Sequence, residues 1–253
     1  MNQSLTIVIP AFNESKRIIK ALDDIDSYIS KISKSDLFQV IVVNDGSTDN
    51  TSGVVNDWIQ NKSRNKKCFQ LASYVLNRGK GYAVNQGFLK VSNSLVLYTD
   101  ADGASPIEEI EKLLFWIDKG FDVAIGSRVL KDNNSIISMS FTRRLTGRIF
   151  HLILSVLGLA SLKDTQCGFK LFKANIAKQL AENQKCFNYS FDIEYLFLLK
   201  KFDYKIKEVP INWYHVEGSK VNIFKDSIKM LVEVLKIRFF YKYNITDLVK
   251  KGL

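Results

Sequence analysis

Hydrophobic positions in the first half of the chain form short β-branched runs, separated by stretches with helical spacing. Such runs are typical of parallel strands buried on both faces, and the helical stretches are typical of the crossovers between them. The expected strands are LTIVIP, FQVIVVND, FQLASYVL, SLVLYTD and FDVAIGS. The expected helices cover about residues 14–33, 48–60, 81–91 and 106–119. The pattern therefore predicts an α/β fold with a doubly wound, mostly parallel, Rossmann-like sheet.

Polar loops follow these strands, with the sequences AFNES, NDGSTDNT, NRGKG and DADGAS. In an open α/β sheet, the loops at the carboxyl ends of the strands are the usual place for ligands. The loop after the first strand lacks the GxGxxG of dinucleotide-binding proteins, and NRGKG lacks the GxxxxGK[ST] of a phosphate loop. We therefore expect neither an oxidoreductase of that type nor a P-loop nucleotidase.

The net charge of +10 is unevenly distributed. Residues 1–130 contain 15 Lys and Arg against 15 Asp and Glu, whereas residues 131–253 contain 21 against 11. The whole excess lies in the second half, which points to an anionic partner such as a membrane surface or nucleic acid. A basic surface that serves only solubility is the alternative.

Two carboxylates, Asp100 and Asp102, come directly after an apolar strand with only Ala101 between them. At the end of a buried strand such a pair suffers desolvation and repulsion unless positive charge lies nearby. Mg²⁺ and Mn²⁺ prefer oxygen ligands, and Mg²⁺ typically uses one or two carboxylates together with substrate phosphates. A solvated turn is the alternative. Because Asp45 ends an earlier strand of the same sheet, we interpret the pair as a site for Mg²⁺ or Mn²⁺ and a diphosphate.

Four motifs in this order, VIPAFNES, VVNDGSTDNT, NRGKGYAVNQG and YTDADGASP, resemble the GT-A nucleotide-sugar domain of family 2 glycosyltransferases. In the second half, GSR, DTQCGFKLF, FDIEYL and EVPINWYHVEGSKV resemble the dolichyl-phosphate β-glucosyltransferases, which are close relatives of the dolichyl-phosphate mannose synthases. The resemblance extends from about Leu5 to Tyr241. It implies a GT-A domain over residues 1–221, with a nucleotide-sugar-binding half (1–130) and an acceptor half (131–221).

The resemblance also implies roles for individual residues. Donor binding falls to Pro10, Phe12, Glu14, Val43, Asp45, Asp100, Ala101, Asp102 and Lys220. Asp102, the stronger candidate, and Asp100 are expected to bind the metal. Arg128 is expected to contact phosphate, and Arg143, or Arg144 beside it, the lipid phosphate. The expected catalytic set is Asp100, Asp102, Arg128 and Arg143.

Asp192 and Glu194 lie two residues apart in the apolar stretch FDIEYL. Many inverting glycosyltransferases use a carboxylate to deprotonate a sugar hydroxyl, but a lipid phosphate is already ionised and needs no base. We therefore assign both residues to organising cationic groups around the acceptor, with a structural salt bridge as the alternative.

Residues 222–253 are expected to form an amphipathic helical extension. Its apolar positions have helical spacing, and lysines occupy an adjoining face: Phe224, Ile228, Leu231 and Leu235 against Lys225, Lys229 and Lys236. Such a helix lies in the plane of a membrane interface, or packs on the core of its own domain. The longest apolar run, Ile149–Leu162, is too short to span a bilayer. We expect a peripheral protein at the cytoplasmic face of an anionic membrane, with no transmembrane helix.

The expected function is inverting transfer of a sugar from a nucleotide diphosphate to a polyprenyl (dolichyl-type) phosphate. UDP-glucose is the favoured donor, because DTQCGFKLF and EVPINWYHVEGSK look more like the glucose-transferring branch. A GDP-mannose-dependent mannosyltransferase and a family 2 transferase with a saccharide acceptor are the enzymatic alternatives. A basic membrane- or nucleic-acid-binding protein is the non-enzymatic alternative. The DAD and NDGSTD loops argue against that last reading, and we expect no nucleic acid partner.

Overall fold

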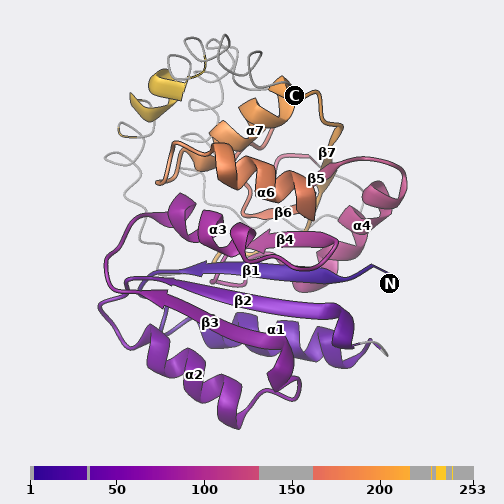
Figure 1. Ribbon diagram of the computed structural model, residues 1–253. Coiled ribbons are helices and arrows are strands. Elements are labelled where there is room, and N and C mark those ends of the chain that lie inside the picture. Colours follow the sequence, from indigo (N-terminus) through magenta and orange to yellow (C-terminus); the bar gives the residue numbers. More distant parts are fainter. Residues whose placement is uncertain are drawn as a thin grey trace.

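The computed structural model describes residues 3–32, 35–130, 162–216, 229, 232–237 and 241. Within these ranges one seven-stranded sheet has the order β3-β2-β1-β4-β6-β5-β7 (Figure 1). Its strands are β1 (Leu5–Ala11), β2 (Phe38–Asp45), β3 (Phe69–Tyr74), β4 (Leu95–Thr99), β5 (Val123–Ser127), β6 (Phe169–Lys173) and β7 (Ile206–Pro210). Strand β6 runs antiparallel to β4 and β5, and the other pairs are parallel. The prediction of a mostly parallel α/β sheet is confirmed.

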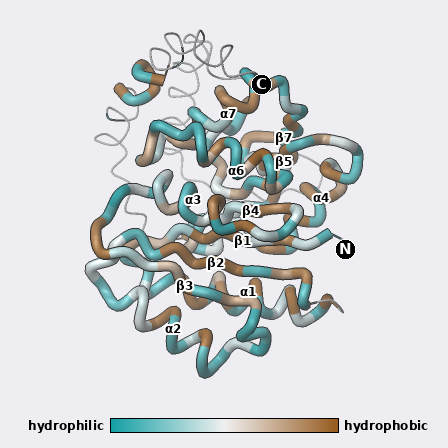
Figure 2. The backbone as a smooth tube through the Cα atoms, in the orientation of Figure 1, coloured by the Kyte–Doolittle hydropathy of each residue, from teal (hydrophilic) through white to brown (hydrophobic). Residues whose placement is uncertain are grey.

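Helices cover both faces of the sheet. They are α1 (Ile18–Ser30), α2 (Thr51–Asn61), α3 (Lys80–Leu89), α4 (Ile110–Asp118), α6 (Ala174–Asn183) and α7 (Phe191–Lys201). Short 3₁₀ turns lie at Ser35–Leu37, Lys66–Cys68 and Ile107–Glu109. One hydrophobic core contains residues of α1, α2 and α4, and the other contains residues of α3, α6 and α7. In β1, Ile7 and Ile9 belong to the first core and Val8 to the second. This two-sided burial explains the continuous apolar runs of the central strands (Figure 2).

Strand β6 joins the two expected halves of the domain. It comes from residues beyond 131, yet it lies between β4 and β5 of the first half. Residues 1–130 and the later part of the chain therefore share one sheet, and the expected halves are not separate folding units.

Two element boundaries differ from the hydrophobic pattern. The run FQLASYVL predicts a strand through Leu76, but β3 ends at Tyr74. Within the described part of the chain β3 pairs with β2 alone, and β2 ends at Asp45, opposite Tyr74, so no described strand continues the pairing. The first helix begins at Ile18, because residues 14–17 form turns in front of it.

The described residues of the last segment pack on the domain itself. Val234, Ile237 and Tyr241 are buried in the core that contains α3, α6 and α7. The Tyr241 hydroxyl donates to Asn183 O at 2.9 Å and to Glu194 Oε1 at 2.6 Å. This face of the segment therefore matches the alternative of core packing.

The opposite face of this segment leaves Val232 and Leu235 exposed. Phe224, Lys225, Ile228 and Leu231 lie outside the described residues, so the prediction of a membrane-surface helix over 222–253 remains a prediction. No helix in the described part of the chain combines the length and apolar character that crossing a bilayer requires.

Candidate active site

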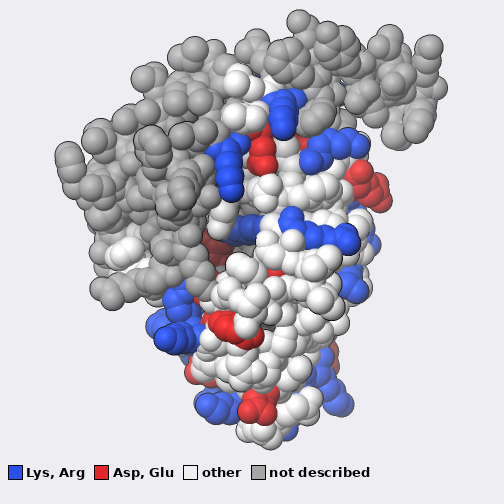
Figure 3. All heavy atoms as spheres, turned by 90° about the vertical axis from the view of Figure 1, so that its left-hand side faces the viewer, with Lys and Arg blue, Asp and Glu red and all other residues white. Residues whose placement is uncertain are grey.

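The carboxyl ends of β1, β2, β4 and β5 meet at one edge of the sheet, because these strands run in the same direction. Figure 1 shows the arrowheads of β1, β2 and β3 pointing to this side, and Figure 3 views the molecule from it. In Figure 3, Lys and Arg side chains border a recessed acidic patch. The loops that sequence analysis selected begin at this edge.

Hydrogen bonds join the first two of these loops. Asn13 Oδ1 accepts from the backbone N–H groups of Thr48 and Asp49, at 2.7 and 3.1 Å. In the other direction, Ser47 Oγ accepts from Asn13 N at 2.8 Å. The motifs AFNES and NDGSTD are therefore one structural unit at the ends of β1 and β2.

Lys80, the first residue of α3, neutralises the first carboxylate of the DAD motif. Its Nζ lies 2.7 Å from Asp100 Oδ1, and the Tyr98 hydroxyl donates to the same oxygen at 3.1 Å. The other oxygen lies against Gly168, where a Cβ would come within 2.0 Å of Asp100 Oδ2. The glycine of DTQCGFKLF is therefore required for the approach of this carboxylate to the backbone.

The second carboxylate, Asp102, is much less compensated. Its Oδ1 accepts from Ala104 N at 3.1 Å, and the nearest cation among the described residues is Arg17, with Nη1 4.0 Å from Oδ2. Glu14 positions that cation, because its two oxygens accept from Arg17 Nη2 and Nε at 2.6 and 2.7 Å. Glu14 is expected to bind the nucleotide-sugar donor. In this structure it orients Arg17 toward Asp102.

The two carboxylates have opposite pKa shifts. Burial acts to raise the pKa of Asp100, but the ion pair with Lys80 and the Tyr98 hydroxyl outweigh it and hold this pKa below its usual value. Burial raises the pKa of Asp102, and repulsion from Asp100 adds to the increase. Negative charge is thus in excess at Asp102, where a cation would relieve it.

This donor set fits a divalent cation that is shared with a substrate. Among the described residues no cluster of three or more His, Cys, Asp or Glu could hold a metal ion. Mg²⁺ commonly takes only one or two carboxylates and completes its shell with substrate phosphates and water. Asp102, with one backbone hydrogen bond, would be the principal ligand, and Asp100, already paired with Lys80, the lesser one.

Arg128, which follows β5, is bound by a buried carboxylate. Its Nε and Nη2 each donate to Asp164 at 2.8 Å, and its backbone N–H donates to the same carboxylate at 2.9 Å. Glu208 fixes the pair from β7 by accepting from Asp164 N and from the Ser127 hydroxyl, at 2.8 and 2.7 Å. The charge of Arg128 still helps to lower the pKa of Asp100. A direct contact between Arg128 and phosphate remains a prediction.

Asp192 and Glu194 have different surroundings, although both lie in the first turn of α7. Asp192 Oδ1 lies 2.5 Å from Nζ of Lys170, which is 1% exposed and also donates to Cys167 O at 2.6 Å. Burial raises the pKa of Asp192 against the opposing effect of Lys170. Asp192 is therefore in the structural salt bridge that sequence analysis gave as the alternative.

Glu194 forms no ion pair with the described residues, so its expected role in organising cationic groups remains a prediction. It is fully buried, and its oxygens accept from the backbone N–H groups of Lys185 and Cys186 at 2.8 Å and from the Tyr241 hydroxyl. Residues two apart on a helix point in widely different directions, so only one of the pair can face the site. Glu194 holds the loop before α7 against the C-terminal segment.

Asp45 also has partners within the chain. Its oxygens accept from the Tyr74 hydroxyl at 2.7 Å, Asn77 Nδ2 at 2.8 Å, and the backbone N–H groups of Arg78 and Gly79 at 2.8 and 2.9 Å. These four donors match the roughly four acceptor positions of a carboxylate. Asp45 therefore fixes the NRGKG loop, from which Lys80 reaches Asp100. Recognition of a base or ribose by Asp45 remains a prediction.

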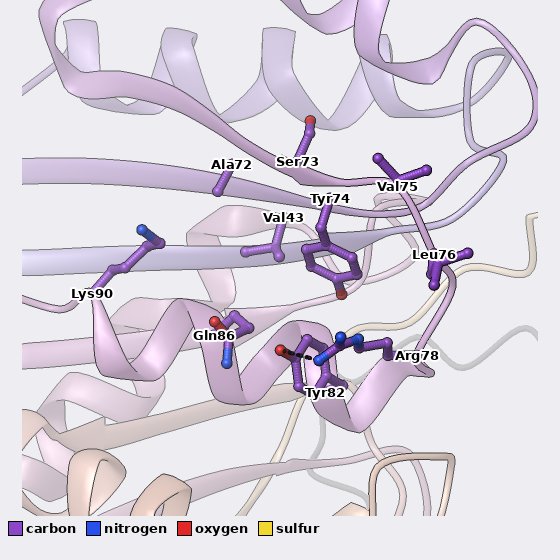
Figure 4. Close-up of a pocket in the computed structure, with 10 residues that line it drawn as sticks. All are labelled: Val43, Ala72, Ser73, Tyr74, Val75, Leu76, Arg78, Tyr82, Gln86 and Lys90. Carbon is purple, nitrogen blue, oxygen red and sulfur yellow. Dashed lines mark hydrogen bonds between the residues drawn. The ribbon is translucent and has the colours of Figure 1, made fainter.

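The other expected donor residues are divided between the core and the surface. Pro10, Val43 and Ala101 are buried, whereas Phe12 is exposed just after β1. Val43 also lines a pocket of about 490 Å³ between β3 and α3 (Figure 4). Arg143, Arg144 and Lys220 lie outside the described residues, and their expected roles remain predictions.

The structure adds four charged residues that sequence analysis did not select: Arg17, Lys80, Asp164 and Lys170. Lys80 lies in NRGKG, Asp164 and Lys170 lie in DTQCGFKLF, and Arg17 lies two residues after AFNES. Several carboxylates at one edge require cations nearby, and this requirement is a sequence signal for the lysines in these motifs.

An open, mostly parallel sheet whose central strand ends in a carboxylate pair, surrounded by loops from the neighbouring strands, fits the GT-A fold. The family model Glycosyl transferase family 2 matches residues 6–181. The chain belongs to glycosyltransferase family 2.

Similar proteins agree with this assignment. A dolichyl-phosphate beta-glucosyltransferase of Dictyostelium discoideum is 35% identical over 96% of this chain and 76% of that protein. The protein of the same name in Saccharomyces cerevisiae is 36% identical over 95% of this chain and 76% of that protein. Glucosyl-3-phosphoglycerate synthase from Mycobacterium tuberculosis, solved with Mn²⁺ and UDP-glucose, has a TM-score of 0.67 at 17% identity, over 92% of this chain and 78% of that chain. At that identity the likeness shows the fold.

We predict that Lys80→Met weakens binding of the nucleotide sugar by about 1.5–3 kcal/mol, the typical value of a hydrogen bond to a charged group. Without Lys80, two uncompensated carboxylates would repel the diphosphate. Calorimetric titration with UDP-glucose measures the loss. Lys80→Arg should restore much of the affinity, and Lys62→Met, at an exposed lysine just beyond the end of α2, is the matched control. Equal affinity of Lys80→Met and the unchanged chain would contradict this role.

We also predict that Asp102→Asn abolishes most transfer and leaves the fold intact. Nucleotide affinity should depend on Mg²⁺ or Mn²⁺ in the unchanged chain and lose that dependence in the variant. Titrations with and without the cation measure this, with Asp24→Asn on the exposed face of α1 as the control. Full transfer in excess chelator would refute the metal site.

Proposed function

We propose that this glycosyltransferase moves glucose from UDP-glucose to the phosphate of a polyprenyl lipid of the dolichyl type, with inversion at the anomeric carbon. Relatives at 34–36% identity that match 94–96% of the chain carry the name dolichyl-phosphate beta-glucosyltransferase. One solved neighbour of the same fold binds UDP-glucose with Mn²⁺. These names support both the donor and the lipid acceptor.

The surroundings of Asp192 are the observation that favours a phosphate over a sugar hydroxyl as the acceptor. A hydroxyl acceptor needs a carboxylate that can take up its proton. Asp192 is 4% exposed and paired with Lys170 at 2.5 Å, so it is poorly placed to meet a substrate hydroxyl. A lipid phosphate is already ionised and makes no such demand. The saccharide-acceptor alternative is therefore less favoured.

In the proposed reaction, an oxygen of the lipid phosphate attacks the anomeric carbon as the bond from that carbon to the nucleotide diphosphate breaks. The leaving diphosphate gains negative charge, which Lys80 and Arg17 would offset from the two sides of the DAD motif. A bound Mg²⁺ or Mn²⁺ would supply further positive charge there. Asp102 and Asp100 are the residues that would hold the cation.

The acceptor side of the proposal depends largely on residues outside the described ranges. Arg143, or Arg144 in its place, would bind the lipid phosphate by a charge-assisted hydrogen bond, and Lys220 would close over the donor. Arg128, which is held by Asp164, would act on the site through its positive charge. We further propose that the protein acts at the cytoplasmic face of a membrane, bound peripherally to anionic lipid.

A panel of labelled UDP- and GDP-sugars tests the donor and the acceptor together. Each donor is offered with a polyprenyl phosphate and Mg²⁺ or Mn²⁺, and labelled lipid is extracted and counted. We expect labelling from UDP-glucose and not from GDP-mannose. Labelling from GDP-mannose alone would make the protein a mannosyltransferase. Nucleotide binding without lipid labelling from any donor would contradict a lipid phosphate acceptor.

A further inference from the structure

Exposed apolar side chains collect at the edge of the sheet that carries the candidate active site. Ten large hydrophobic residues are exposed in the described part of the chain. Six of them belong to segments at the carboxyl edge of the parallel strands: Phe12, Val75, Leu76, Val129, Phe187 and Tyr214. Phe187 reaches this edge from the loop before α7, where its ring lies 5.6 Å from that of Tyr82. Apolar groups gathered at one edge mark an interaction surface.

The two most exposed of these apolar residues lie in the turn after β3. Val75 is 91% and Leu76 69% exposed. The backbone of this turn is nonetheless firmly held, because Asp45 accepts from the N–H groups of Arg78 and Gly79. It also lies so close to Gly46 that a Cβ there would come within 2.6 Å of Leu76 C. A well-anchored turn with two apolar side chains in water is not explained by the stability of the domain.

Cationic side chains flank these apolar residues. Arg78 is exposed two residues after Leu76, and its guanidinium lies 4.9 Å from the Tyr82 ring centre and donates to the Tyr82 hydroxyl at 2.9 Å. Figure 4 shows Val75 and Leu76 at the end of β3, near Arg78 and Tyr82. Lys185 is exposed beside Phe187. Apolar and aromatic groups bordered by cations suit the boundary between anionic lipid headgroups and acyl chains.

We propose that the carboxyl edge of the sheet is the membrane-facing surface of this protein, and that Val75 and Leu76 insert into an anionic bilayer. This inference rests on the proposed function, because a lipid phosphate acceptor must reach the DAD motif from the bilayer. Asp100 and Asp102 follow β4 at the same edge, so the acceptor phosphate would enter from the surface that contacts the headgroups. The surface lies mainly in the first half of the chain, whose charges balance, and not only in the basic second half.

Cosedimentation of the full chain with phosphatidylcholine–phosphatidylserine vesicles tests the inference. We expect the Val75→Ser/Leu76→Ser double variant to bind the vesicles roughly tenfold more weakly or worse, because it loses two apolar side chains from the bilayer. Leu89→Ser is the matched control, since Leu89 is an exposed apolar residue at the C-terminal end of α3, whereas the turn with Val75 and Leu76 comes before the N-terminal end of that helix. Binding of the unchanged chain should also fall as salt rises.

Equal vesicle binding by the double variant and the control would overturn the inference. So would a double variant that changes only the oligomeric state in size-exclusion chromatography, since the surface would then meet a second copy of the chain. Transfer to a short-chain polyprenyl phosphate without vesicles separates this inference from the proposed function. Val75 and Leu76 also line the pocket that contains Val43, so this transfer is measured at saturating donor, where it should be equal in the double variant and the unchanged chain. If the unchanged chain lacks it, the proposed function fails, whatever the vesicles show.

Discussion

The balance of charge around the DAD motif is the constraint on which the rest of the site depends. Asp100 and Asp102 lie at the end of a buried strand, and the chain compensates them unequally. Asp100 is paired with Lys80 at 2.7 Å, whereas the nearest cation to Asp102 in the described part of the chain lies at 4.0 Å. The pKa of Asp100 is therefore lowered, whereas burial and repulsion from Asp100 raise the pKa of Asp102. This inequality supports our proposal that a cation and a diphosphate bind at this edge.

Other polar networks hold that arrangement in place. Asp45 fixes the NRGKG loop from which Lys80 extends, and Gly168 allows the backbone to approach Asp100. Buried ion pairs, Arg128 with Asp164 and Lys170 with Asp192, line the same region. Buried pairs of this kind add little net stability, but loss of either partner leaves an isolated charge and is costly. Their contribution here is to fix positions around the two carboxylates.

Much of the fold could be predicted from the sequence, because strands covered on both faces leave continuous apolar runs. The DAD motif was also evident, since two carboxylates at the end of a buried apolar strand require a compensating positive charge. The charge partners were harder to find. Lys170 lies on β6, an antiparallel strand inserted between β4 and β5, and no local pattern signals that insertion. The surroundings of Glu194 were not evident from FDIEYL as a motif. In the structure this motif is part of a helix, and the side chains of its two acids point in different directions.

In the proposed reaction, a lipid phosphate attacks the sugar directly, opposite to the departing diphosphate. The stereochemistry of a single transfer tests this direction of attack. UDP-glucose labelled at its anomeric carbon is incubated with a short-chain polyprenyl phosphate, and the glycolipid product is examined by carbon and phosphorus NMR. Since the donor is α-linked, we expect a β-linked glucosyl phosphate. An α-linked product, or free glucose in place of glycolipid, would contradict it.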